Sequence, residues 1–313
     1  MRLPTTIVCA LLGGLPTTSF SHELQNLSDQ TQQLSDLLNT TRLKEIAETQ
    51  ADENTRYVYA RLLLWQVGQK LKGCFFNGSD KEKSLVKKMA DQIVSASGAN
   101  ISFDFGPDGS FRLCDEPGRR SDIRVSFNHG CCSAYIGRVA HYPQASLLSG
   151  PTVMLQGVSN LGDAVGRQIV VHELMHALGF EHEHQAPDNP CQFNKAAVQA
   201  RTGMNDQEFS VNIGKLNKDK SSYKWSSYDN ASIMKYFYYP EELVGGTANP
   251  CYSGNNLFLS DRDKEGLRNA YPSTGSKISR DVERSVVVQI GDGSTSSEVK
   301  TLVRALRELD TSR

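Results

Sequence analysis

His172-Glu-Leu-Met-His176-Ala-Leu-Gly-Phe-Glu-His182 is the stretch that determines how this 313-residue chain is interpreted. His172 and His176 are four residues apart, so on a helix both imidazoles leave one face, one turn above the other. Gly179 can take a positive φ at little cost, so the helix can end there and the chain can turn back to bring His182 to the same point. Three neutral imidazoles that leave one coordination position open are typical of a catalytic zinc site.

Glu173 follows the first of these histidines and is rotated about 100° from it by the helical pitch. This rotation keeps its carboxylate out of the ligand set but within reach of a water molecule that the metal activates. A non-catalytic zinc site is the main alternative, but such sites are usually closed by four protein ligands and are rich in cysteine. The pattern therefore predicts a zinc-dependent hydrolase with the metal ligands His172, His176 and His182 and with Glu173 as general base.

Glu183 and His184 extend the motif, and the whole pattern resembles the metzincin metalloproteases and, among them, the astacin family of zinc peptidases. Downstream, Ser232-Ile-Met234-Lys-Tyr236 is similar to the Met-turn of that family. The resemblance implies that Met234 forms an apolar floor beneath the zinc and that Tyr236 leans onto the metal or stabilises the oxyanion of peptide hydrolysis. Taken alone, the methionine would be a filler of core gaps. Glu183 and Tyr236 favour the astacin branch over the matrixin branch.

The resemblance also implies an α+β fold of the metzincin type. Such a fold has a twisted, mostly parallel sheet with helices in an N-terminal subdomain, a zinc cleft and an irregular C-terminal subdomain. Hydrophobic patterns predict strands at residues 71–76, 101–105 and 122–127 and helices at 81–95 and from near Gly166. The resemblance further implies an edge strand within 130–137 and a closing helix within 258–272. An extended peptide substrate is expected to add itself to that edge strand.

The chain departs from the family pattern at Ala186, where an arginine is usual, and at Lys235, where a histidine is commoner. A family cysteine expected shortly before the zinc helix is also missing. Glu183 in the family meets the freed N-terminus of the mature enzyme. This match motivates the hypothesis that removal of a preceding segment matures the cleft.

The first 21 residues are typical of an export signal, with a basic start, an apolar core from Ile7 to Leu15 and a small-x-small pattern that ends at Ser21. The alternative, a mature N-terminal strand or helix, fits less well because the segment is short and uniformly apolar. Residues 22–55 are polar and leucine-spaced and lack Gly and Pro, which predicts a helical prosegment that blocks the cleft in cis, or else a solvated spacer. We therefore expect a secreted protein that is made as a zymogen.

The catalytic domain is expected to span residues 56–272. Residues 273–313 open with a Ser/Gly linker and continue with an apolar run and an amphipathic helix. This C-terminal extension either packs back on the protease or binds a partner, and the sequence leaves both interpretations open.

The net charge is −1, from 34 basic and 35 acidic residues, which argues against a nucleic acid or an anionic membrane as partner. No stretch approaches the roughly 18 to 20 apolar residues of a transmembrane anchor. Without Cys9 in the signal, the cysteines are Cys74, Cys114, Cys131, Cys132, Cys191 and Cys251. An even number in an exported chain predicts disulfide bonds, with fifteen pairings open and the adjacent Cys131 and Cys132 bonded to different partners.

Together these observations predict a secreted zinc metalloendopeptidase that hydrolyses peptide bonds in protein or peptide substrates and holds one catalytic Zn²⁺. The alternative from another class is a secreted binding or adhesion module whose protease domain is a relic. The intact Glu173 argues against that alternative, because a relic has no need of the general base.

Overall fold

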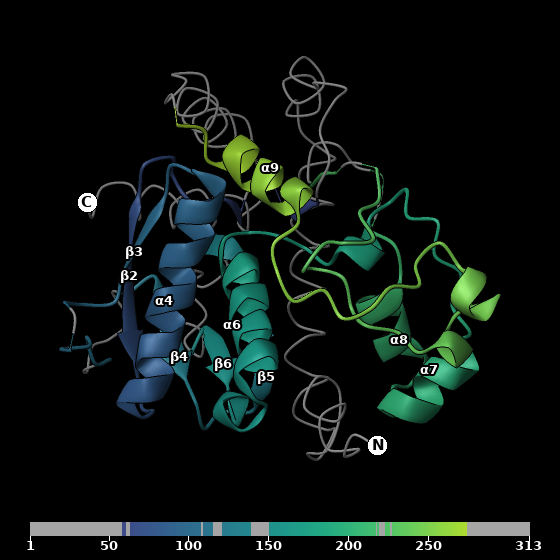
Figure 1. Ribbon diagram of the computed structural model, residues 1–313, viewed down its shortest axis with the longest axis horizontal. Helices are drawn as coiled ribbons and strands as arrows, with labels where there is room; N and C mark the ends of the chain where they lie inside the picture. The colour runs from purple at the N-terminus through teal and green to yellow at the C-terminus, as the bar shows by residue number, and fades with distance from the viewer. Residues whose placement is uncertain are drawn as a thin grey trace, which may run out of the picture.

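The computed structural model describes most of the chain between residues 58 and 273. The described residues are 58–60, 63–107, 109–114, 121–138, 150–216, 218, 223–225 and 227–273. The expected signal peptide, prosegment and C-terminal extension beyond residue 273 lie outside them, so these predictions stay untested. Figure 1 shows a sheet with two long helices on one side of the described part and a lobe of short helices and turns on the other.

A five-stranded sheet forms the framework of the N-terminal lobe, with the strand order β3-β2-β4-β6-β5. The strands are β2 (Lys70–Phe75), β3 (Ser102–Asp104), β4 (Ile123–Ser126), β5 (Cys131–Ala134) and β6 (Val153–Leu155). β3, β2, β4 and β6 run parallel, whereas β5 pairs antiparallel with β6 at one edge of the sheet. The mostly parallel sheet, its three predicted strands and the edge strand within residues 130–137 are confirmed.

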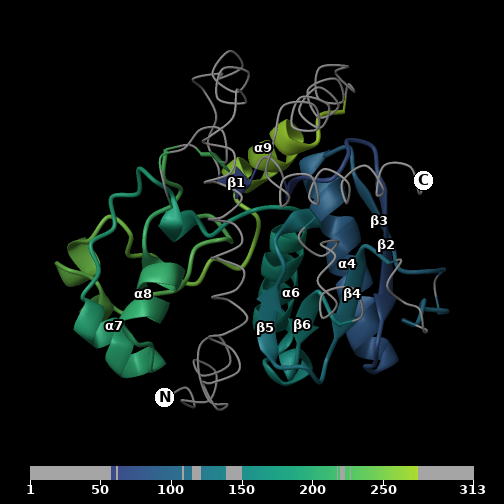
Figure 2. The ribbon, with the colours of Figure 1, turned by 180° about the vertical axis from the view of Figure 1, so that it is seen from behind.

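Two long helices, α4 (Asp80–Ser97) and α6 (Asp163–Ala177), lie side by side against this sheet, as Figures 1 and 2 show from opposite directions. α4 begins with a capping box, in which Ser79 and Glu82 each accept a hydrogen bond from the backbone of the other. Both helices and the sheet share one hydrophobic core, which includes the buried side chains Leu71, Phe75, Val86, Ile93, Ile123, Val153, Val170 and Leu174. α6 begins slightly before the predicted start near Gly166. No helix among the described residues is both long and apolar enough to traverse a bilayer.

The C-terminal lobe contains two helices that the sequence patterns did not predict, α7 (Lys195–Thr202) and α8 (Asp206–Ile213). Each spans only eight residues and begins at an asparagine N-cap, Asn194 or Asn205. Helices of this length are defined by their caps more than by an apolar period, so periodicity overlooked them. The remaining elements are β1 (Tyr59–Ala60), which pairs with β7 (Tyr223–Lys224), the predicted closing helix α9 (Asp261–Ala270), and the 3₁₀ turns η4 (Val158–Asn160), η5 (Glu183–Gln185), η6 (Pro240–Glu242) and η7 (Gly246–Ala248).

Disulfide bonds are present in both lobes, as the even cysteine count predicted. Cys74 in β2 is bonded to Cys114, and Cys191 is bonded to Cys251 across a sequence separation of 60 residues. Cys132 is also disulfide-bonded. The Cys191–Cys251 bond cross-links the C-terminal lobe, which has few long helices or strands to stabilise it.

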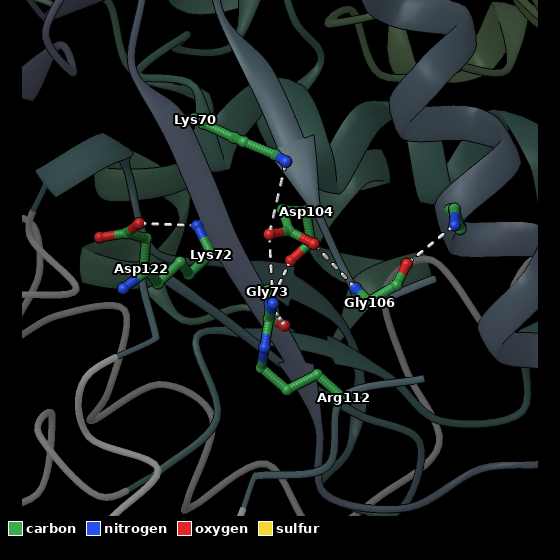
Figure 3. A network of polar contacts seen from close by, with 8 residues as sticks. Lys70, Lys72, Gly73, Asp104, Gly106, Arg112 and Asp122 are labelled. Atoms are coloured by element: carbon green, nitrogen blue, oxygen red, sulfur yellow. Dashed lines mark hydrogen bonds and ion pairs between the residues drawn. The ribbon is translucent and has the colours of Figure 1, made fainter. Parts of the chain in front are cut away.

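A network of polar contacts joins the segment that follows β3 to β2 and β3 (Figure 3). The Asp104 carboxylate accepts a hydrogen bond from the Gly106 backbone at 3.0 Å and pairs with Nη2 of Arg112 at 3.2 Å. Nη1 of Arg112 donates to the Gly73 carbonyl at 3.0 Å and also to the Asp104 carbonyl. Arg112 thereby attaches the segment that leads to Cys114 to β2 and β3, at the edge of the sheet opposite β5.

Gly73 generates the first prediction, because β2 has no room for a side chain at this position. A Cβ atom built there would lie 2.2 Å from two ring carbons of Phe105. Gly73→Ala should therefore lower the free energy of unfolding by about 1–3 kcal/mol, measured by urea denaturation. Gly254→Ala is the matched control, since its Cβ would meet nothing within 4 Å. Equal stability of the two variants would contradict the tight packing described for β2.

Candidate metal centre

The three histidines of the sequence motif converge in the structure. His172 and His176 lie on consecutive turns of α6, with ring centroids 4.8 Å apart. His182 lies beyond the end of the helix, and its ring centroid is 4.5 Å from that of His176. Each histidine offers one ligand atom, and the three atoms lie within 4.8 Å of one another. The structure thus brings together all three predicted ligands.

The turn that delivers His182 depends on Gly179. α6 ends at Ala177, and Gly179 follows with a φ of 97°, in the region that favours glycine. A Cβ atom there would also lie 2.9 Å from a methyl carbon of Leu64. The Gly179 carbonyl accepts a hydrogen bond from the Ala60 backbone at 3.0 Å, so β1 holds the turn from outside. The predicted helix end is confirmed.

Each imidazole is oriented by a hydrogen bond at Nδ1. Nδ1 of His172 lies 2.9 Å from the Ile233 carbonyl, and Nδ1 of His176 lies 2.7 Å from the Phe180 carbonyl. Nδ1 of His182 lies 3.0 Å from Oε1 of Gln185, whose amide nitrogen donates to backbone carbonyls of Val211 and Gly214. Carbonyl oxygens only accept, so each Nδ1 carries the proton and each Nε2 keeps a lone pair.

These neutral donors fit a divalent metal ion. Nε2 of His176 and Nε2 of His182 lie 3.0 Å apart, and two lone pairs that face each other at this distance are favourable only when they share a cation. Burial lowers the pKa of His172 to about 4 and that of His176 to about 3, and it holds the pKa of His182 well below the usual value. The triad is therefore uncharged at neutral pH, which is the form that binds metal.

Glu173 lies buried beside the triad, with 4% of its surface exposed. Burial raises its pKa to about 8, and Oε2 has no hydrogen-bond partner among the described residues. A carboxylate in this position is costly unless a cation is near, since an unpaired buried anion loses its hydration. This orphaned carboxylate is a second observation that fits a metal ion at the histidines.

The Met-turn, residues 232–236, packs against the histidines. Met234 is buried in the central core, and its carbonyl accepts a hydrogen bond from the Glu183 backbone at 3.1 Å. The Tyr236 ring centroid lies 4.4 Å from that of His182 and 6.2 Å from that of His172. Burial and, after it, the nearby Glu173 raise the pKa of the Tyr236 phenol, so this group stays protonated and able to donate.

Asp263 of α9 was not found from the sequence, although it holds the Met-turn. Its carboxylate accepts hydrogen bonds from the Ser232 hydroxyl at 2.6 Å and from the Ile233 N–H at 2.9 Å. The Ile233 carbonyl in turn orients His172, so Asp263 acts on the first ligand through the backbone of one residue. The Ser260-x-x-Asp263 capping box is visible in the sequence, but its link to a turn 30 residues away is not.

Glu183 lies in a buried acidic cluster with Asp229 and Asp263. Its carboxylate accepts a hydrogen bond from the Asp229 N–H at 2.7 Å, and 3% of its surface is exposed. Burial, together with the neighbouring carboxylates, raises the pKa of Glu183 to about 8, and burial raises that of Asp263 to about 6. Such a cluster favours a cation within it.

Lys235, the departure in the Met-turn, is also buried and donates to the carbonyls of Tyr236 and Cys251 at 3.1 and 3.2 Å. Burial lowers the pKa of its ammonium group to about 8. Lys235 thereby joins the Met-turn to the Cys191–Cys251 disulfide. Ala186, the other departure, is fully buried.

Comparisons with known proteins agree with this geometry. The model of the Astacin peptidase family matches residues 109–247, which contain the histidine motif and the Met-turn. Zinc metalloproteinase nas-12 of Caenorhabditis elegans is 31% identical over 105 residues, or 34% of this chain and 22% of the relative. Zinc metalloproteinase nas-2 of the same organism is 34% identical over 118 residues, or 36% of this chain and 35% of the relative.

The chain spans about a third or less of the length of these two curated relatives. Among solved structures, myroilysin aligns with a TM-score of 0.58 and 26% identity, and the alignment covers 69% of this chain and 99% of myroilysin. The likeness to myroilysin therefore extends over almost the whole of that protein.

The raised pKa of Glu173 predicts how the metal-free protein responds to pH. The unfolded chain loses this proton near the ordinary pKa of 4.5, whereas the folded chain keeps it up to about 8. Between these values unfolding releases a proton, so the stability contributed by this group falls as pH rises, by about 1.4 kcal/mol per unit. Glu173→Gln removes the titration. Its gain in melting temperature over the parent should therefore grow from about pH 5 to about pH 8.

Asp91→Asn, at an exposed position of α4, is the matched control for the loss of one carboxylate. Saturating zinc should shrink the advantage of Glu173→Gln, because the cation stabilises the buried anion. A difference that stays constant over this pH range would mean that Glu173 is not desolvated as described.

Proposed function

Because the chain carries an astacin-like metalloprotease domain with the α+β fold that the sequence implied, we propose that it is a secreted zinc endopeptidase that hydrolyses peptide bonds in proteins. One observation carries the proposal. Three imidazoles, each oriented by a hydrogen bond at Nδ1, bring one ligand atom each within 4.8 Å of the others, and a buried carboxylate follows the first of them in α6. The relatives nas-12 and nas-2 bear the name zinc metalloproteinase, which supports zinc as the ion.

The residues around this point have complementary tasks in the proposed reaction. His172, His176 and His182 would hold the ion, which when bound supplies a Lewis acid for the scissile carbonyl and the attacking water. Glu173 takes the proton from water and returns it to the departing amine. Tyr236 donates its phenol proton in a hydrogen bond to the oxyanion of the tetrahedral intermediate.

The substrate we propose is an extended peptide that pairs with β5. β5 is the antiparallel edge strand of the sheet, and α6 packs against it. An edge strand offers unpaired backbone groups, so a peptide added there gains main-chain hydrogen bonds with little dependence on its sequence. This arrangement favours cleavage of varied protein substrates over recognition of one small molecule.

We also propose that removal of the segment before the catalytic domain completes the site. The chain at Val58–Ala60 runs antiparallel to residues 179–181, with Tyr59 opposite Phe180 and Val58 accepting a hydrogen bond from the Glu181 N–H. Glu181, whose N–H donates to the Val58 carbonyl, lies two residues before Glu183 of the acidic cluster. A new N-terminal ammonium group near residue 56 would supply the cation that this cluster favours.

Chelation and replacement of Glu173 together test the proposed activity. Casein hydrolysis by the purified protein should stop with a chelator and return with zinc. Glu173→Ala should lower turnover by at least about 10²-fold, because general-base catalysis contributes about 10²- to 10⁴-fold, while stoichiometric zinc remains bound. Asp91→Ala should keep full activity. Zinc binding without any hydrolysis by the parent protein would instead favour the relic binding module.

Trimming tests the maturation proposal. A chain that begins near residue 56 should hydrolyse peptides faster than the full-length chain, by on the order of 10-fold or more if a buried ion pair orders the site. Glu183→Gln in the trimmed protein should remove most of this gain, because the amide no longer attracts the ammonium group. Equal specific activities of full-length and trimmed protein would contradict the proposal.

A further inference from the structure

The C-terminal end of α8 contacts the metal centre through two neighbouring side chains. Gln185 donates to the Val211 and Gly214 carbonyls at 2.7 and 3.1 Å, and Nε2 of His184 lies 2.9 Å from the Asn212 carbonyl. The last carbonyls of a helix have no partner within the helix, so they are strong acceptors for such side chains. Gln185 orients the ligand His182, whereas His184 has no assigned task in the mechanism above.

His184 uses both ring nitrogens to join two distant segments. The Asn212 carbonyl only accepts, so Nε2 carries the proton and Nδ1 keeps its lone pair. That lone pair accepts a hydrogen bond from the Tyr236 N–H at 3.4 Å. The ring is fully buried, and these two hydrogen bonds use the neutral imidazole, which donates on one side and accepts on the other.

The His184 ring also packs against the ring of Tyr236, the residue whose backbone N–H donates to it. Its centroid lies 4.4 Å from that of Tyr236, 5.0 Å from that of His182 and 5.7 Å from that of Tyr238. Tyr236 belongs to a segment without helix or strand, so no regular backbone pattern determines its direction. Its N–H is held by His184 and its carbonyl by Lys235.

We propose that His184 is a positioning residue, which holds the Tyr236 backbone and ring against the end of α8 so that the phenol reaches the oxyanion. The inference rests on the proposed peptidase function. It adds a residue that touches neither the substrate nor the metal, and it makes α8 of the C-terminal lobe a structural support of the catalytic tyrosine. A residue that only filled the core would need neither ring nitrogen.

A double-mutant cycle tests this inference. His184→Phe keeps a ring between Tyr236 and His182 but lacks both nitrogens, and Tyr236→Phe removes the phenol hydroxyl. We expect His184→Phe to lower kcat by on the order of 10-fold or more, with KM changed less than about 3-fold, because a misplaced group weakens catalysis more than binding. In the Tyr236→Phe background the same change should cost less than about 3-fold, since the hydroxyl that it positions is already absent.

Tyr238→Phe provides the matched control, because the Tyr238 ring also contacts His184 but its hydroxyl has no hydrogen-bond partner among the described residues. The fold-losses of kcat caused by His184→Phe and by Tyr238→Phe should multiply in the double variant, as expected for independent sites. Zinc content should stay stoichiometric in every variant, and the absorption spectrum of the Co²⁺-loaded His184→Phe protein should match that of Co²⁺-loaded Tyr236→Phe more closely than that of the parent.

Three outcomes would overturn the inference. The first is an equal loss of kcat from His184→Phe in both backgrounds, the second is loss of zinc from His184→Phe, and the third is a change confined to KM. If the phenylalanine variant does not fold, the same cycle with His184→Gln decides the matter by the same criteria. Absence of chelator-sensitive hydrolysis in the parent protein would refute the proposed function itself, whereas independent losses in an active enzyme refute only the role of His184.

Discussion

The candidate metal centre depends on the three hydrogen bonds that orient the imidazoles at Nδ1. A histidine offers either nitrogen to a metal, and the partner of the other nitrogen decides which one is free. Here the acceptors are the Ile233 carbonyl, the Phe180 carbonyl and the Gln185 side chain, and they come from three separate segments. The geometry of the histidine triad is therefore a property of the whole fold and not of α6 alone.

The segments that supply these three acceptors are themselves held by contacts with other parts of the fold. The Met-turn supplies the acceptor for His172 and is itself held by Asp263 of α9 and by Lys235, which contacts the backbone at the Cys191–Cys251 disulfide. The turn after α6 supplies the acceptor for His176, and β1 holds it through Gly179. The end of α8 holds Gln185 and, through it, His182. Each histidine of the triad thus has its own support, and the supports share few residues.

The sequence was sufficient to predict the convergence of the three histidines and the parallel core of the sheet, because each has a local pattern. The i, i+4 spacing of His172 and His176 and the glycine at 179 specify geometry within one helix and one turn. The supports of the site have no such pattern. Asp263, His184 and the end of α8 act through contacts across 28 to 52 residues of chain. α7 and α8 escaped prediction because caps, and not a long apolar stripe, define them.

The hydrogen bond from His172 to Ile233 spans 61 positions along the chain. During synthesis the histidine motif leaves the ribosome well before Ile233 and Asp263 do, so the first ligand has no orienting acceptor while the polypeptide is still growing. An incomplete nascent chain therefore carries all three histidines before it carries the carbonyl that orients His172. The triad thus reaches its final arrangement only after the segment that contains Ile233 has folded onto α6.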